Sequence, residues 1–170
     1  MGRTRGDARR WRWLVIGLAF AFSACGFHLR GAKPSPFETL YLNASMTSGI
    51  GPVLRRAVEA GGTTRVVDNP EDAKARLDVL NEAREKSILS LNAAGQVREF
   101  QIRYRIAFSV HDGKGKVFIA PSQITLNRDI TFNDSQILAK ETEESMLYRD
   151  MQDDAVQQIL RRLAAVRVSE

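Results

Sequence analysis

The chain has 170 residues, of which 44% are hydrophobic, and its formal net charge is +5. This length and composition are typical of one globular domain with a core of its own. We predict no nucleic-acid partner, because residues 1–24 hold five arginines and one acid, whereas the rest of the chain holds 20 basic and 19 acidic residues.

Residues 1–24 have the anatomy of a signal peptide. An arginine-rich start precedes an apolar run at residues 14–22, which is much shorter than the ~20 residues that span a bilayer. A transmembrane anchor is therefore the weaker alternative. The pair Arg9-Arg10 is compatible with twin-arginine export, but the neighbouring residues favour general secretion.

The only cysteine, Cys25, follows this apolar run after two small residues. The stretch from Phe22 to Cys25 resembles a bacterial lipobox, with Phe22 standing where such motifs usually carry Leu. We expect cleavage before Cys25, lipidation of its thiol and stable anchoring by several acyl chains. The residue after Cys25 is Gly26 and not Asp. In the usual sorting pattern of lipoproteins, the absence of Asp at this position indicates passage to the outer membrane. The alternative is a plain secretory signal with a cysteine near the mature N-terminus.

The mature chain is expected to begin with a linker at residues 25–36, where two prolines favour an extended backbone. We predict a strand over residues 37–42 and, after a polar loop, an amphipathic helix over residues 52–60. Pro52 suits the first turn of this helix, and the glycine pair that follows suits its end. A short strand is predicted over residues 63–67.

The middle of the chain is rich in strand signals. Residues 76–91 are long for one flat strand, so we predict a bend or bulge near residues 82–86. A turn is expected at residues 92–95. The next strand, residues 99–111, has a strict period of two, with apolar residues at its even-numbered positions. This alternation predicts one buried face and one wet face.

A hairpin is predicted at residues 112–115, where two glycines supply the positive φ that tight turns need. The chain then returns as a strand over residues 116–132, in which Pro121 marks an edge strand or a bulge. A long amphipathic helix follows and begins between Ser135 and Thr142. Its apolar residues recur four positions apart, and arginines lie near its end.

The predicted order of elements is therefore β-α-β-β-β-β-α. We assign the chain to the α+β class, as a two-layer sandwich in which two helices pack on one face of a mixed β-sheet. Residues 37–170 are expected to form this sandwich as a single domain.

The motifs in the sequence do not favour an enzyme. The chain has two histidines, His28 and His111, and it lacks a Gly-rich phosphate loop, a Cys-x-x-Cys pair and the common hydrolase motifs. We therefore predict no catalytic residue, no metal site and no cofactor.

Basic residues inside structured segments are better candidates for a binding role. Arginine and lysine suit phosphate and carboxylate groups, and arginine can bind them in bidentate fashion. The candidates are Arg98, Arg103, Arg105 and Lys140. Spacing alone favours the alternative that they belong to a solvated strand face, balanced by nearby acids.

Four stretches of the mature chain resemble, in this order, the LptE family of LPS-assembly lipoproteins. The first is the heptapeptide Cys25–Gly31, which is similar to the N-terminus of mature family members. The next two are Gly51–Val58, in the predicted helix, and Gly95–Phe100, which opens the alternating strand. The fourth is Leu138–Lys140, together with the methionines that follow it.

This resemblance implies a lipid-anchored protein on the periplasmic side of the outer membrane, seated in the lumen of the β-barrel LptD as a plug and assembly aid. It also implies binding of lipopolysaccharide on its way to the outer leaflet. Lys140 matches a family lysine that contacts this glycolipid. A second basic position of some members is Ala93 here, and Arg98 lies near enough to replace it. We expect the Arg103 and Arg105 face and the hairpin turns to touch the barrel wall.

Two other functions stay open on the sequence. One is a different envelope-assembly or peptidoglycan-facing scaffold lipoprotein, and the heptapeptide Cys25–Gly31 argues against it. The other is a periplasmic enzyme, and the motif census argues against that.

Overall fold

The computed structural model describes residues 35–47, 49–133 and 136–167. The predicted signal peptide, Cys25 and most of the predicted linker lie outside the described residues. The elements in chain order are β1 (Thr39–Asn43), α2 (Gly51–Ala60), β2 (Arg65–Val67), the 3₁₀ turn η2 (Pro70–Asp72), β3 (Ala75–Leu91), β4 (Val97–His111), β5 (Val117–Thr131) and α3 (Ile137–Ala165). This is the predicted order with one added turn, η2.

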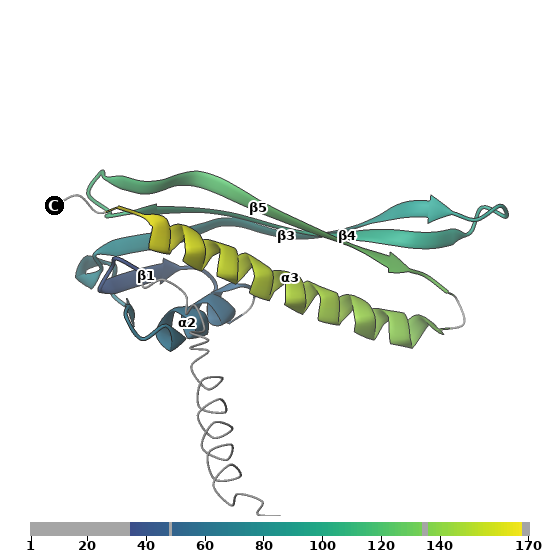
Figure 1. Cartoon of the computed structure of the whole chain (residues 1–170), viewed down its shortest axis with the longest axis horizontal. Helices are drawn as coiled ribbons and strands as arrows, with labels where there is room; N and C mark the ends of the chain where they lie inside the picture. Colours follow the sequence, from purple (N-terminus) through teal and green to yellow (C-terminus); the bar gives the residue numbers. More distant parts are fainter. Residues whose placement is uncertain (1–34, 48, 134–135, 168–170) are drawn as a thin grey trace, which may run out of the picture. The chain divides into compact units, whose positions relative to one another are not determined.

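The five strands form one sheet in the order β2-β1-β3-β4-β5. β1 is parallel to both β2 and β3, whereas the pairs β3-β4 and β4-β5 are antiparallel. Helices α2 and α3 lie on the same side of this sheet (Figure 1). These features confirm the predicted α+β sandwich, with a mixed sheet and two helices on one face.

Alternation along β4 decides which face of the sheet is buried. The residues of β4 that are fully buried on the helix side are Ile102, Tyr104, Ile106, Phe108 and Val110. The odd-numbered residues between them are only half-buried, and they lie on the opposite side, which we call the open face. Burial of the apolar side chains under α2 and α3 removes their surface from water, and this stabilises the fold. The predicted two-faced strand is confirmed.

Both predicted hairpin turns are present, and each is held by the side chain that opens it. Asn92 Oδ1 accepts hydrogen bonds from two backbone N–H groups of its own turn, each at 2.9 Å. Asp112 Oδ1 accepts one from the Lys114 N–H at 2.7 Å and a second from farther along the turn. These bonds, the one from Lys114 above all, lower the pKa of Asp112. Such side-chain caps are the reason that Asn and Asp favour turns.

β3 contains the predicted irregularity, but beside residues 82–86 rather than within them. This segment pairs regularly with β4, from Glu82 opposite Ile106 to Lys86 opposite Ile102. The register shifts instead on either side of the segment, between residues 79 and 81 and again after residue 88. A break was predicted because the stretch is long for one flat strand, and charged residues interrupt its apolar pattern. The first of these charges has partners beneath the sheet.

That first charge is the carboxylate of Glu82, which joins three separate parts of the fold. It accepts hydrogen bonds from the hydroxyl of Tyr104 at 2.8 Å, the backbone N–H of Ile50 at 3.0 Å and the side-chain amide of Gln152 at 3.3 Å. Gly49, at φ +72°, packs so closely that an added Cβ would collide with this carboxylate. Burial, and next the bond to Glu82, raises the pKa of Tyr104 far above its usual value.

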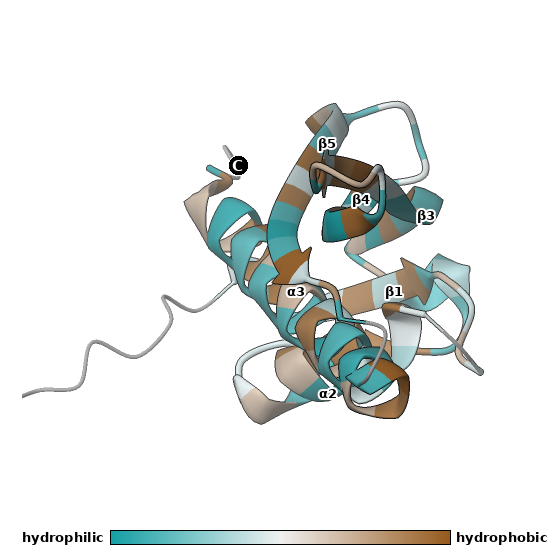
Figure 2. Ribbon diagram, turned by 90° about the vertical axis from the view of Figure 1, so that its right-hand side faces the viewer, coloured by the Kyte–Doolittle hydropathy of each residue, from teal (hydrophilic) through white to brown (hydrophobic). Residues whose placement is uncertain are grey.

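The edge strand β5 and the helix α3 complete the sandwich. The register of β5 against β4 shifts between Ile119 and Ser122, on either side of Pro121, so the prediction for this proline is confirmed. Both hydrophobic and hydrophilic residues occur along β5 (Figure 2). α3 begins at Ile137, within the predicted window, and its second residue, Leu138, is 79% exposed. Within the described ranges, no helix is long and apolar enough to cross a membrane.

Candidate functional site

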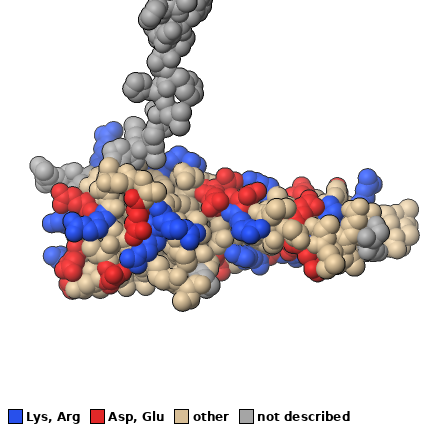
Figure 3. Space-filling view, turned by 90° about the horizontal axis from the view of Figure 1, so that it is seen from below, with Lys and Arg blue, Asp and Glu red and all other residues tan. Residues whose placement is uncertain are grey.

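A pocket of about 260 Å³ lies where the start of α3 meets β3, β4 and the end of β5. Its floor is apolar and consists of Phe100, Ile130, Phe132 and Ile137. The rings of Phe100 and Phe132 meet edge to face, with centroids 5.3 Å apart. Charges of both signs are interspersed over the helix side of the molecule (Figure 3).

Two lysines from different elements line this pocket, each paired with a carboxylate of α3. Lys140 Nζ lies 2.8 Å from Glu143 Oε2 and donates a second hydrogen bond to the Thr131 hydroxyl at 3.1 Å. Lys86 Nζ, from β3, lies 2.6 Å from Glu144 Oε2 and 4.4 Å from the centroid of the Phe100 ring. The pocket therefore combines cationic groups with an aromatic floor.

Arg98 lies close to this pocket, at the end of β4. Its carbonyl accepts the backbone N–H of Phe132 at 2.8 Å. It lies two residues before Phe100, where the register of β3 against β4 shifts. Its side chain is exposed and makes no ion pair with any other residue in the described ranges.

Arg103 and Arg105 are not part of this group. They lie on the open face, since the residues that alternate with them are buried beneath the helices. Both pair with Glu85: Arg105 through a hydrogen bond and Arg103 at 3.7 Å. Arg103 also donates to Asn127 Oδ1 at 3.0 Å. Of the four predicted residues, Lys140 therefore lines the pocket, Arg98 lies near it, and Arg103 and Arg105 are paired with Glu85 on the open face.

The sequence did not single out Lys86 or the aromatic floor. Lys86 belongs to a run of mixed charges in β3, and its partner Glu144 is 58 residues away in the chain. Only the register of β3 against β4 brings Lys86 beside Phe100, on the side that α3 covers. No local sequence signal identifies such a pair.

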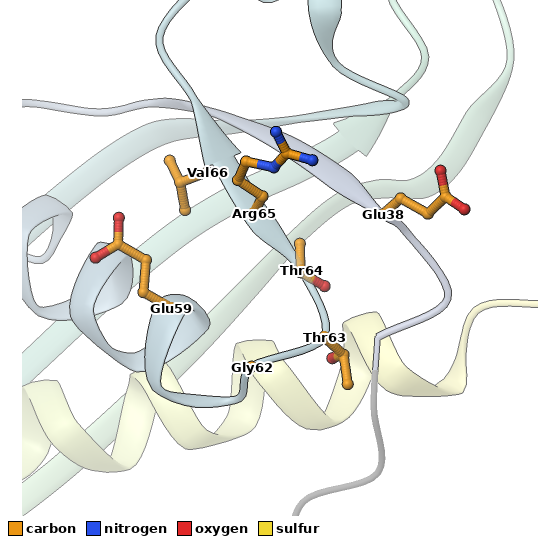
Figure 4. A pocket seen from close by; sticks show the side chains of 7 residues that line it. All are labelled: Glu38, Glu59, Gly62, Thr63, Thr64, Arg65 and Val66. Carbon is orange, nitrogen blue, oxygen red and sulfur yellow. The ribbon is translucent and has the colours of Figure 1, made fainter.

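A second, wider groove lies beside β2 and the end of α2 (Figure 4). Glu59 projects from α2, Arg65 and Val66 project from β2, and Glu38 comes from the segment before β1. The Thr64 hydroxyl donates a hydrogen bond to the Phe37 carbonyl at 2.8 Å. The groove thus offers scattered charges of both signs and no paired acid and base. We assign it no chemistry.

The side chain of His111 is hydrogen-bonded within the fold. Its Nε2 lies 2.6 Å from Asp78 Oδ2, and its Nδ1 accepts the backbone N–H of Gly113 at 2.9 Å. Both ring nitrogens are therefore used, and neither is available to a metal or a substrate. The side chains of the described ranges contain no group of three or more His, Cys, Asp or Glu that could hold a metal ion. His28 lies outside those ranges.

Comparison with known proteins gives one consistent result. Residues 37–163 match the family described as LptE, lipopolysaccharide-assembly. The LPS-assembly lipoprotein LptE of Yersinia enterocolitica is 30% identical over 167 residues, which are 92% of this chain and 77% of that protein. The protein of the same name from Photorhabdus laumondii is 27% identical over 161 residues, covering 92% and 87% of the two chains.

Solved structures agree with these sequence matches. The solution NMR structure of lipoprotein B from Nitrosomonas europaea superposes with a TM-score of 0.70 at 43% identity and covers 82% of this chain and 91% of its own. The crystal structure of the rare lipoprotein B from Shewanella oneidensis gives 0.66 at 26% identity, covering 75% and 94%.

Proposed function

The chain belongs to the LptE family of lipopolysaccharide-assembly lipoproteins, and we propose from this membership that it binds LPS and partners the LptD β-barrel at the outer membrane. Membership gives the chain a role in LPS assembly in the cell envelope, and this role is not enzymatic. The prediction that the chain is not an enzyme is therefore confirmed. The barrel, the glycolipid contacts and the outer-membrane location are our proposal.

The observation that carries LPS binding is the pocket that contains Lys140. An LPS molecule presents phosphate groups next to acyl chains, and this pocket presents an ammonium next to aromatic and aliphatic side chains. Lys140 lines this pocket, and its two polar contacts leave one of the three N–H donors of its ammonium for such a headgroup. Ammonium groups are common phosphate ligands in proteins. The exposed Arg98 adds another cation nearby.

The open face supports the proposed seat inside a barrel. Its central residues form a polar layer, in which Gln101, Arg103 and Asn127 are joined by hydrogen bonds of 3.0–3.1 Å. A barrel lumen is itself polar, so a polar sheet face can meet it without burying unpaired apolar surface. We propose that this face and the two hairpin turns contact the LptD wall.

We further propose that acyl chains on Cys25 anchor the protein to the periplasmic side of the outer membrane. The linker at residues 25–36 would then let the folded domain enter the barrel from that side. Replacing Cys25 with Ser should release the protein from the membrane fraction, as measured by fractionation of the cell envelope. A variant that stays in the membrane at wild-type level would contradict lipid anchoring.

The partner proposal is tested by purifying the protein from the outer membrane in mild detergent and identifying what accompanies it. One large β-barrel protein at one-to-one stoichiometry would support the plug. Recovery with a peptidoglycan-associated complex would favour the scaffold alternative and contradict ours.

The glycolipid proposal is tested by Lys140→Asp, measured as binding of purified LPS. Charge reversal at the pocket should weaken binding at least about tenfold, because it replaces a charge-assisted contact with a repulsive one. The control is Lys114→Asp, a reversal in the exposed turn between β4 and β5, which should bind like the parent. Equal binding by Lys140→Asp and Lys114→Asp would contradict the assignment of Lys140.

A further inference from the structure

The two lysines of the pocket share an unusual arrangement. Each belongs to a different layer of the sandwich, yet their carboxylate partners are the consecutive residues Glu143 and Glu144 of α3. Both lysines and Glu144 line the same cavity. One turn of α3 therefore neutralises both cations that face the apolar floor.

We infer that Lys86 is a second headgroup ligand of this pocket and that Glu144 is an internal competitor, which an anionic amphiphile displaces from Lys86. This inference rests on the proposed function, because it concerns the same pocket as Lys140. It goes beyond that function in naming a second cation, a competing carboxylate and a minimal ligand: one phosphate joined directly to a hydrocarbon chain.

The geometry of Lys86 supports a role in binding. An ammonium has three N–H donors, and Glu144 Oε2 takes one of them. The side chain is 39% exposed, so a ligand can reach the remaining donors. An ion pair at this degree of exposure contributes little to stability, and exchanging its carboxylate for a phosphate therefore has a small cost.

The ligand must be an amphiphile, because the cations lie directly on apolar surface. Lys86 Nζ is above the ring of Phe100, which contacts Phe132. Beyond the pocket, Ile88 is paired with Phe100 across the strands and is 58% exposed. A hydrocarbon chain attached to a phosphate between the lysines would thus cover residues that water now contacts.

Substitution of Glu144 distinguishes competition with a ligand from a purely structural role of the ion pair with Lys86. If the pair only fastens β3 to α3, removing either partner should leave ligand binding unchanged in the folded protein. If Glu144 competes with the ligand, its removal should improve binding, whereas removal of Lys86 should weaken it. The two substitutions then act in opposite directions, which a loss of stability cannot imitate.

The experiment measures binding of decyl phosphate, below its micelle concentration, to the full-length protein in mild detergent. Lys86→Met and Lys140→Met should each weaken binding about tenfold, the loss expected for one charge-assisted hydrogen bond. Glu144→Gln, which keeps the shape of the side chain, should strengthen binding several-fold. Lys114→Met is the matched control and should have no effect. Thermal unfolding of each variant shows that it is folded.

The outcomes separate the two proposals. Wild-type binding by Lys86→Met, or weaker binding by Glu144→Gln, would overturn the inference. The same variants are then measured with LPS and with phosphatidylglycerol in the same detergent. LPS binding that depends on Lys140 but not on Lys86 keeps the proposed function and overturns the inference. Dependence on both lysines for decyl phosphate and phosphatidylglycerol, with no LPS binding, keeps the inference and contradicts the proposed ligand.

Discussion

The two ends of the β3-β4 hairpin are built from the same strands but differ in what they do with apolar side chains. At the end covered by α2 and the later turns of α3, β4 buries Ile106, Phe108 and Val110 completely. At the end beside the start of α3, Ile88 and Leu138 are largely exposed, and Lys86 lies on the face that the helix covers. At the first end, which we call the closed end, the burial of apolar side chains stabilises the fold. At the second, which we call the open end, apolar side chains and cations are accessible together.

The largest expected effect is at the closed end, and it tests this contrast directly. Ile106→Ala should lower the free energy of unfolding by about 2–5 kcal/mol, because it removes a buried side chain and leaves a cavity. Ile88→Ala, the same change at the open end, should alter it by less than about 0.5 kcal/mol, as surface substitutions do. Urea denaturation of both variants measures the difference. Similar losses in the two variants would break the comparison.

The second effect concerns Glu82, which lies between the two ends. Glu82→Ala should cost about 1–3 kcal/mol, because it leaves the Tyr104 hydroxyl and the Ile50 N–H without their acceptor. Glu82→Gln keeps one acceptor oxygen and should cost less. Thermal unfolding ranks the two variants. If the alanine variant were as stable as the parent, Glu82 would not be what holds the junction of β3 with α3.

Much of this architecture was predictable because it depends on local patterns. The period of two in β4 identified its buried face, Asn92 and Asp112 identified the turns, and Pro121 identified the edge strand. In each case the signal and the structure it specifies lie within a few residues of each other. The exact position of the bulges in β3 was not predictable. The regular segment between them includes Glu82, whose partners are in β4, just before α2 and in α3, which no window along β3 contains.

The candidate site was predictable only in part, for the same reason. Lys140 was identified through a motif of its own helix. Arg103 and Arg105 had suitable chemistry, but their pairing with Glu85 on the open face depends on the register of two strands. Lys86 had no signal, since its partners Phe100 and Glu144 become its neighbours only after the sandwich forms. Binding residues on separate layers are therefore the least accessible to sequence reasoning.

A smaller effect, confined to alkaline pH, follows from Tyr104. Burial raises its pKa in the folded protein above the unfolded value near 10. Its contribution to stability is therefore complete below pH 10 and is lost as pH rises towards the folded pKa, since the unfolded chain releases the proton first. Tyr104→Phe should flatten this decline between about pH 9 and pH 11, in urea titrations at each pH. Tyr148, whose pKa is also raised by burial, remains as a second source of the decline.

A further small effect on stability is expected at Lys86, at the open end, and it is the most informative about function. Lys86→Met should change the free energy of unfolding by less than about 1 kcal/mol, because a partly exposed ion pair gains little over solvated charges. Yet the same substitution should weaken the binding of an anionic amphiphile about tenfold. If the open end holds a ligand site, Lys86 should contribute far more to ligand binding than to the stability of the fold. A stability loss comparable to that of Ile106→Ala would instead mean that the hairpin end is as tightly packed as the core.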